Sequence, residues 1–128
     1  MNIYKLHSEP ESLDHFEKAT ETNPDVFWEK YKNKPEELKK REKYIAKSAD
    51  FSFYYAVDIL SAPFPAGEEA IAKSAGYAYD YAADALKGPF PAGEAAIAKD
   101  EYFASLYAKN VLKKDFYLNG KLIAKYEP

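Results

Sequence analysis

The sequence of 128 residues predicts an all-α protein: a short, right-handed, α-solenoid-like stack of two-helix repeats with divergent terminal caps. The phrase "PFPAGEEAIAK" at residues 63–73 returns as "PFPAGEAAIAK" at residues 89–99, 26 residues later and with ten of eleven positions identical. The triplet Ile-Ala-Lys keeps the same period, at 45–47, 71–73, 97–99 and 123–125. Because neither helix of such a unit buries its apolar face alone, the units are expected to stack.

The composition fits one globular domain spanning residues 1–128. Hydrophobic residues make up 47% of the chain and charged residues 30%, with a formal net charge of −3. The absence of cysteine excludes disulfides, thiolate zinc sites and cysteine nucleophiles. No apolar run approaches the roughly 20 residues of a membrane span, and the first residues lack a signal-peptide core. We therefore expect a soluble, cytoplasmic protein that does not contact a membrane.

Each unit is expected to begin with its longer helix. In the second copy, the apolar residues of 78–86 follow i, i+3, i+4, i+7 spacing, which gives one stripe for the core. Gly88 and Pro89 then predict the C-terminus, because glycine favours the left-handed cap and proline cannot continue a helix. The start is predicted by a residue whose side-chain oxygen accepts from first-turn N–H groups: Ser48, Ser74 or Asp100.

The repeated phrase predicts a corner followed by a shorter helix. Pro65 and Pro91 suit a first helical position, where a missing N–H costs nothing. Glu68 and Glu94 follow in the first turn, where the helix dipole favours negative charge. The phenylalanine of "PFP" is expected to fill the gap between units.

Residues 1–47 are predicted to form divergent N-terminal helices before the regular repeats of residues 48–114. Ser8 and Glu11 in "SEPESLDHFEKA" form a capping-box pattern that predicts a first helix. "TNPDVFWEKY" resembles a diverged copy of the repeat's longer helix, with Asn23 as its expected N-cap. "KPEELKKREKYIAK" predicts one further helix opened by Pro35.

Residues 115–128 are expected to form the C-terminal cap. "DFYLNGKLIAKYEP" keeps Phe116 and Ile-Ala-Lys in the repeat period, which favours a capping helix. The alternative is a small β-hairpin, since Asn119-Gly120 is the strongest two-residue hairpin signal. Such a hairpin could pair with residues 2–6.

The regular units resemble the tandem helical repeats of accessory proteins from tailed phages and related viruses. The resemblance covers about residues 48–114 and rests on "YAYDYAADALKGPFPAGEAAIAKD" and "YFASLYAKNVLK". This chain departs from the family pattern in lacking the proline after Ser48, Ser74 and Asp100. The resemblance implies repeat architecture and a viral source rather than a reaction. It also implies action in the host-cell cytoplasm on a host factor, for example a defence system.

The sequence offers few groups for catalysis or metal binding. His7 and His15 are the only histidines, and we expect them to be solvent-exposed rather than a metal pair or a general base. Common zinc-protease, phosphate-loop, serine-hydrolase and EF-hand motifs are absent. We therefore expect no enzyme activity, catalytic residue, metal or cofactor.

One lysine recurs in every copy of the repeat. Stacked units would align these lysines about 10 Å apart, the usual spacing of packed helices, where they could follow a nucleic-acid backbone. The alternative is a structural role at a helix end, favoured by the parallel acidic series Asp58 and Asp84 and by the negative net charge. The series is Lys47, Lys73, Lys99 and Lys125.

An aromatic series, Phe51, Tyr77 and Phe103, lies at the edge of the predicted core stripe. These rings are expected either to pack against the short helix or to form an exposed patch for a protein partner. Trp28 of the N-terminal helices joins this candidate partner surface.

Charge is unevenly distributed along the N-terminal third. Residues 9–29 hold seven acids and one lysine, a net charge of −6, and residues 30–47 hold eight bases and three acids, a net charge of +5. These are either two adjacent helices that attract each other or a bipolar surface that steers a charged partner.

The sequence thus favours a non-catalytic protein–protein interaction module. The alternatives are a nucleic-acid-binding repeat protein that uses the lysine series, and a self-assembling protein in which an open end of the stack accepts another copy.

Overall fold

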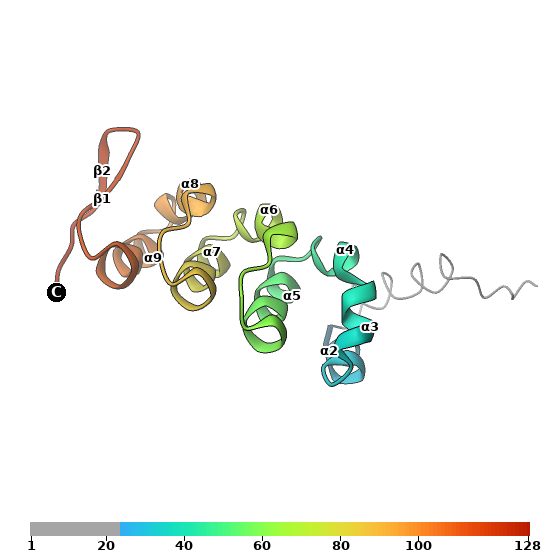
Figure 1. Cartoon of the computed structure of the whole chain (residues 1–128). Helices are drawn as coiled ribbons and strands as arrows, with labels where there is room; N and C mark the ends of the chain where they lie inside the picture. Colours follow the sequence, from blue (N-terminus) through green and yellow to red (C-terminus); the bar gives the residue numbers. More distant parts are fainter. Residues whose placement is uncertain (1–23) are drawn as a thin grey trace, which may run out of the picture. The chain divides into compact units, whose positions relative to one another are not determined.

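The computed structural model describes residues 24–128 (Figure 1). The chain divides into two compact units, residues 1–44 and 45–128. The described part is mostly helical and contains one two-stranded antiparallel sheet. The helical class predicted from the sequence is therefore confirmed, with a small β element at the C-terminus.

The first unit contains α2 (Pro24–Tyr31) and α3 (Pro35–Lys40), and α4 (Glu42–Ile45) follows across its boundary. The single helix predicted from Pro35 is wrong, because the chain turns at Arg41 between α3 and α4. The first helix predicted from Ser8 and the cap at Asn23 lie outside the described residues.

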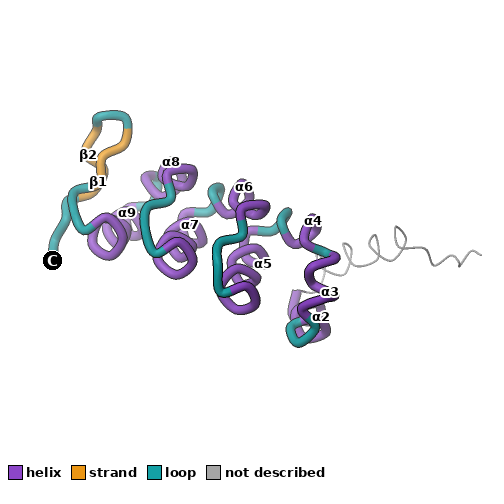
Figure 2. Tube along the Cα trace, in the orientation of Figure 1, coloured by secondary structure: helices purple, strands orange, loops and turns teal. Residues whose placement is uncertain are grey.

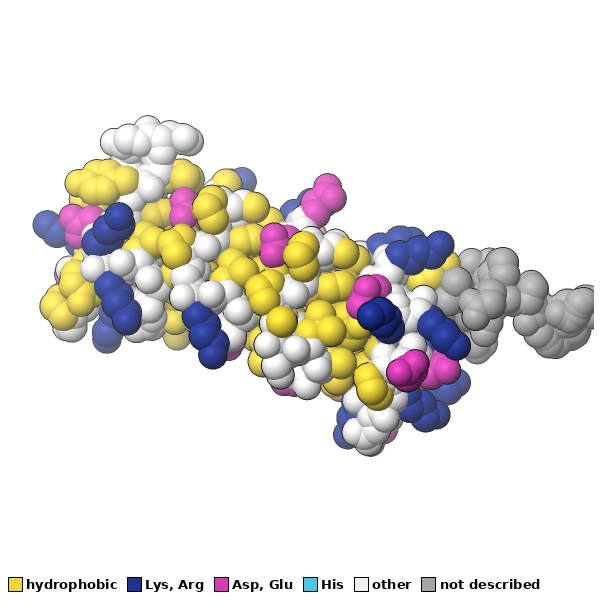
Figure 3. Space-filling view, viewed as in Figure 1, with side chains coloured by type: hydrophobic (Ala, Val, Ile, Leu, Met, Phe, Trp, Pro, Cys, Tyr) yellow, Lys and Arg dark blue, Asp and Glu magenta, His cyan; other side chains and the backbone are white. Residues whose placement is uncertain are grey.

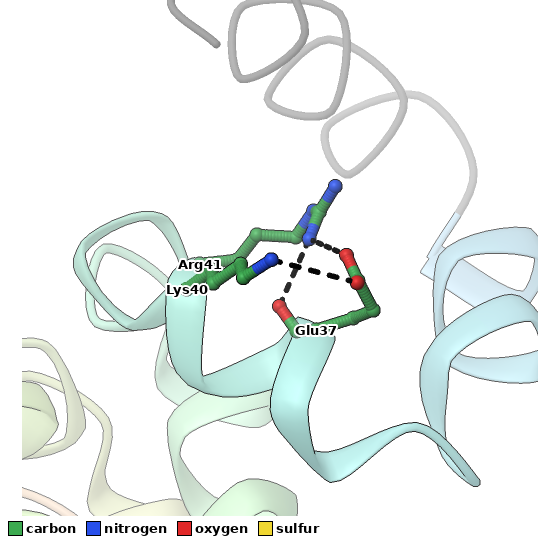
Figure 4. A network of polar contacts seen from close by, with 3 residues as sticks. All are labelled: Glu37, Lys40 and Arg41. Carbon is green, nitrogen blue, oxygen red and sulfur yellow. Dashed lines mark hydrogen bonds and ion pairs between the residues drawn. The ribbon is translucent and has the colours of Figure 1, made fainter.

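The interruption at Arg41 has a visible cause. The Arg41 backbone N–H donates to Leu38 O at 2.9 Å, which leaves Glu37 O without its usual helical donor. The Arg41 guanidinium supplies that donor, with Nη1 at 2.9 Å from Glu37 O and 2.8 Å from Glu37 Oε1 (Figure 4). The Arg41 side chain thus caps the C-terminus of α3 by donating to the carbonyl oxygen that the Arg41 backbone N–H does not reach.

The second unit contains three longer helices, each of which ends in a π-helical turn. The first two are followed by an extended corner, a 3₁₀ turn and a short α-helix. In order these are α5 (Ala49–Tyr54, π turn Tyr55–Leu60), 3₁₀ Pro65–Gly67, α6 (Glu68–Ile71), α7 (Ala75–Tyr81, π turn Ala82–Leu86), 3₁₀ Pro91–Gly93, α8 (Glu94–Ala98) and α9 (Glu101–Leu106, π turn Tyr107–Leu112).

Within this unit the longer helices form one layer and the short helices another (Figures 1 and 2). Helix α7 contacts α5 on one side and α9 on the other. The short helix α6 packs on α5 and α7, and α8 packs on α7 and α9. The core lies between the two layers.

The predicted helix starts are confirmed. Ser48 and Ser74 each accept from the backbone N–H three residues on, at 3.3 Å. Asp100 accepts from the N–H groups two and three residues on, at 3.0 and 3.2 Å. The short helices begin at Pro65 and Pro91, as predicted, with a 3₁₀ turn before the α-helical part.

The predicted C-terminal cap at Gly88 is wrong by one residue. The left-handed residue is Lys87, with φ of 54°, and Ser61 and Lys113 are equivalent, with φ of 51° and 57°. The helix ends as a π turn in which the Lys87 N–H donates to Ala82 O, and the Gly88 N–H donates to the same oxygen at 3.1 Å. This wider turn puts the strained position one residue before the glycine.

The C-terminal cap is a hairpin and not the helix that the repeat period favoured. Strands β1 (Phe116–Leu118) and β2 (Lys121–Ala124) pair antiparallel around Asn119 and Gly120. Both turn residues have positive φ, 54° and 80°, as a two-residue type I′ turn requires. Pairing of this hairpin with residues 2–6 lies outside the described residues.

Equivalent residues of the three copies occupy the same core positions. One tyrosine of each longer helix is at most 1% exposed, and its ring meets the corner phenylalanine edge-on at 4.9–5.1 Å between centroids. The pairs are Tyr55 with Phe64, Tyr81 with Phe90, and Tyr107 with Phe116.

Candidate interaction surface

The buried tyrosine hydroxyls tie successive copies together. The Tyr81 hydroxyl donates to Glu68 Oε2 at 2.6 Å and accepts from the Phe64 N–H at 2.9 Å. Tyr107 repeats this with Glu94 at 2.6 Å and the Phe90 N–H at 3.0 Å.

This environment keeps both phenols neutral. Burial, reinforced by the hydrogen bond to the neighbouring carboxylate, raises the pKa of Tyr81 and of Tyr107 well above the ordinary value of a tyrosine. The two glutamates of the "PAGE" phrase are therefore engaged in holding the fold together.

The predicted aromatic series does not lie on one surface. Phe51 is 5% exposed and belongs to the core, where it offers a partner little area. Tyr77 and Phe103 are half-buried. Their rings contact rings of neighbouring longer helices: Tyr77 lies 5.8 Å from Phe53, and Phe103 lies 6.0 Å from Tyr79.

These contacts belong to two clusters of rings, one between α5 and α7 and one between α7 and α9, which we together call the aromatic row. Tyr54 packs on Tyr77 at 6.3 Å, and Tyr102 packs on Phe103 at 5.0 Å. Tyr54 is 41% exposed and Tyr102 66%. The members of the row are Phe53, Tyr54, Tyr77, Tyr79, Tyr102 and Phe103.

Trp28, the remaining predicted partner residue, lies on α2 in the other unit and is half-buried. Trp28 is therefore not a member of the aromatic row, which lies within the second unit.

The lysine series is exposed in all four copies. Lys73 and Lys99 sit in the turns after α6 and α8, and Lys125 follows β2. Lys47 lies in the turn after α4. The exposure of all four lysines fits both the structural role and the nucleic-acid contact that the sequence left open.

Sequence reasoning did not find the exposed side chains of the hairpin. Tyr117 is 56% exposed and Leu122 41%, and the two residues lie directly opposite each other on β1 and β2. Beside them, an open cavity of about 530 Å³ is lined by Glu94, Leu112, Lys114, Asp115, Phe116 and Tyr117.

Departures from the repeat could have pointed to this surface. Tyr117 stands where the earlier copies have Pro65 and Pro91, and Leu122 stands where they have Ala70 and Ala96. The replacement of smaller residues by large apolar ones in the last copy is the feature of the sequence that could have predicted this exposed surface.

Among residues 24–128, no helix has the length and apolarity needed to traverse a bilayer. In the same part of the chain, no three histidine or acidic side chains come together as a metal site would require. No family model, curated protein or solved structure matched the chain.

Proposed function

We propose that this chain is a non-catalytic protein-binding module, in which residues 48–114 form an α-solenoid-like stack and the aromatic row is its contact surface. The proposal rests chiefly on the row itself. Rings of α5 and α7 meet in one cluster and rings of α7 and α9 in a second. Each cluster holds one substantially exposed tyrosine, Tyr54 in the first and Tyr102 in the second.

The chemistry of such a row suits a protein partner. Tyrosine brings a large apolar ring with a polar tip and few rotatable bonds, so it loses little entropy when it is held in an interface. The half-buried neighbours Tyr77 and Phe103 hold the exposed rings in place. A partner would therefore meet a largely preorganised surface.

The resemblance of the repeats to those of phage accessory proteins directs the search for the partner. We propose a host factor, such as a component of a defence system, bound in the host cytoplasm.

The class of partner is tested by affinity capture. The tagged chain is incubated with a lysate of the candidate host cell, with and without nuclease, at low and high salt. A discrete protein that survives nuclease and moderate salt is the expected result.

The competing function is nucleic-acid binding by the lysine series, Lys47, Lys73, Lys99 and Lys125, all of which are exposed. Recovered nucleic acid that is lost at high salt, and lost with Lys73→Glu plus Lys99→Glu, would contradict the protein-binding proposal.

A further inference from the structure

The C-terminal end, which we define as residues 109–125, is basic. It holds five lysines and one aspartate, a net charge of +4 within a chain of net charge −3. Figure 3 shows lysine side chains beside hydrophobic ones at this end. The exposed lysines are Lys109, Lys113, Lys114, Lys121 and Lys125.

The same end carries an open apolar pair. Tyr117 and Leu122 face each other across the hairpin and are 56% and 41% exposed. Phe116 and Ala124, the next pair along the strands, are buried at 1% and 9%. One pair therefore anchors the hairpin, and the other faces outward among the lysines.

This end is not built to receive a further long helix. Phe53 on α5 contacts the next long helix through Tyr77, and Tyr79 on α7 contacts the next through Phe103. The equivalent residue of α9 is Ser105, which is exposed. A polar residue at the stacking position indicates that the occupant is of another kind.

A segment of complementary character lies at the other end of the sequence. Residues 9–21 hold five acids and one lysine, a net charge of −4. Leu13 and Phe16 stand three residues apart among these acids, the spacing of neighbours on one side of a helix. Residues 9–21 are therefore complementary to the C-terminal end. The segment is acidic and has two apolar side chains, and the C-terminal end is basic and exposes the apolar pair Tyr117 and Leu122.

We propose that residues 9–21 of one copy dock on the C-terminal end of a second copy, giving a salt-sensitive head-to-tail association. Charge complementarity steers the encounter, and the apolar pair adds burial. This contact is separate from the aromatic row and does not depend on the proposed protein partner.

Two other possibilities fit the surfaces less well. Residues 30–47 are also basic, but among residues 28–47 no large hydrophobic side chain is exposed to receive Leu13 and Phe16. A nucleic acid would meet the carboxylates of Glu94 and Asp115 in the cavity beside Tyr117. Leucine at position 122 also lacks the flat ring on which a base stacks.

Sedimentation velocity over a range of concentrations tests the proposal. The wild-type chain is expected to gain mass with concentration at low salt. The gain should vanish at high salt, since the Debye length falls from about 10 Å at 0.1 M to about 3 Å at 1 M. A chain that remains monomeric at every concentration at low salt would overturn the proposal.

Charge reversal locates the surface. Lys114→Glu with Lys121→Glu, the tail-reversed variant, is expected to lower the association constant by about tenfold or more. Lys73→Glu with Lys99→Glu makes the same change in net charge outside the C-terminal end and should leave association close to wild type. Equal effects of the two variants would overturn the assignment, and circular dichroism checks that both are folded.

Mixing identifies the occupant. The head-reversed variant, Asp14→Lys with Glu17→Lys, should also fail to associate alone. Mixed with the tail-reversed variant it should recover association as a mixed pair, because the unaltered acidic segment of the tail-reversed chain then meets the unaltered basic end of the head-reversed chain. Failure to recover association would overturn the assignment to residues 9–21 of a second copy. Loss of association with Tyr117→Ser as well would support the apolar part of the contact, and its retention would contradict that part.

Discussion

The Tyr107 hydroxyl shows how single polar atoms hold neighbouring copies together. It accepts from the buried Phe90 N–H and donates to Glu94. Tyr107→Phe leaves that N–H without its acceptor, so the free energy of unfolding is expected to fall by about 1–3 kcal/mol in urea titrations.

The matched control is Tyr102→Phe, which removes the same atom from a residue that is 66% exposed. It should change stability by less than about 0.5 kcal/mol. Equal unfolding midpoints for the two variants would refute the role assigned to the Tyr107 hydroxyl.

The left-handed residue Lys87 gives a second test at the residue scale. Its φ of 54° is unfavourable for a residue with a Cβ, so Lys87→Gly is expected to stabilise the protein by about 0.5–1 kcal/mol. Lys99→Gly removes the same charge where φ is already −84°, and should not stabilise. Thermal denaturation of the two variants decides the matter, and greater stability of Lys99→Gly would contradict the assignment.

At the scale of elements, glycine sets how closely a short helix approaches a longer one. A Cβ on Gly93 would lie 2.7 Å from Ala78 Cβ and 2.7 Å from the Phe90 ring. Gly93→Ala is therefore expected to cost about 1–3 kcal/mol by overpacking.

Gly88→Ala serves as the comparison, because its added Cβ would meet only Leu86 O, at 3.9 Å, and its φ is not positive. We expect this change to be tolerated in the same unfolding experiment. If Gly88→Ala were the more damaging substitution, the placement of the short helix and of the left-handed cap would both be wrong.

The stabilising contact between Glu37 and Arg41 at the end of α3 is expected to depend on pH. The Arg41 hydrogen bond, aided by Lys40, lowers the pKa of Glu37. A carboxylate with a lowered pKa stabilises the fold above its unfolded-state pKa and loses that contribution as pH falls through the folded value. Wild type should therefore exceed Glu37→Gln in thermal midpoint at neutral pH, and the gap should close in acid. A gap that persists unchanged in acid would contradict this.

The elements that could be predicted are those fixed by nearby residues. The starts at Ser48, Ser74 and Asp100 depend on a side chain and N–H groups two or three residues away, so the sequence alone sufficed. The hairpin was only the second of two alternatives, because the 26-residue period favoured a helix; the local turn signal at Asn119-Gly120 prevailed over that period.

The surfaces were harder to predict, because exposure depends on packing between helices that are distant in sequence. A helical wheel put Phe51 at the edge of the stripe, but packing within the second unit buries it. Tyr54, its near neighbour, stays exposed beside Tyr77 for the same non-local reason.

For the whole molecule, the central claim is that the aromatic row binds a protein. The most direct measurement is the affinity of the captured partner for three proteins: wild type, Tyr54→Ser with Tyr102→Ser, and Tyr117→Ser. We predict that the double variant loses at least about tenfold in affinity, as the loss of interface anchors would cause, while Tyr117→Ser binds as wild type does. Unchanged affinity of a folded double variant would contradict the claim.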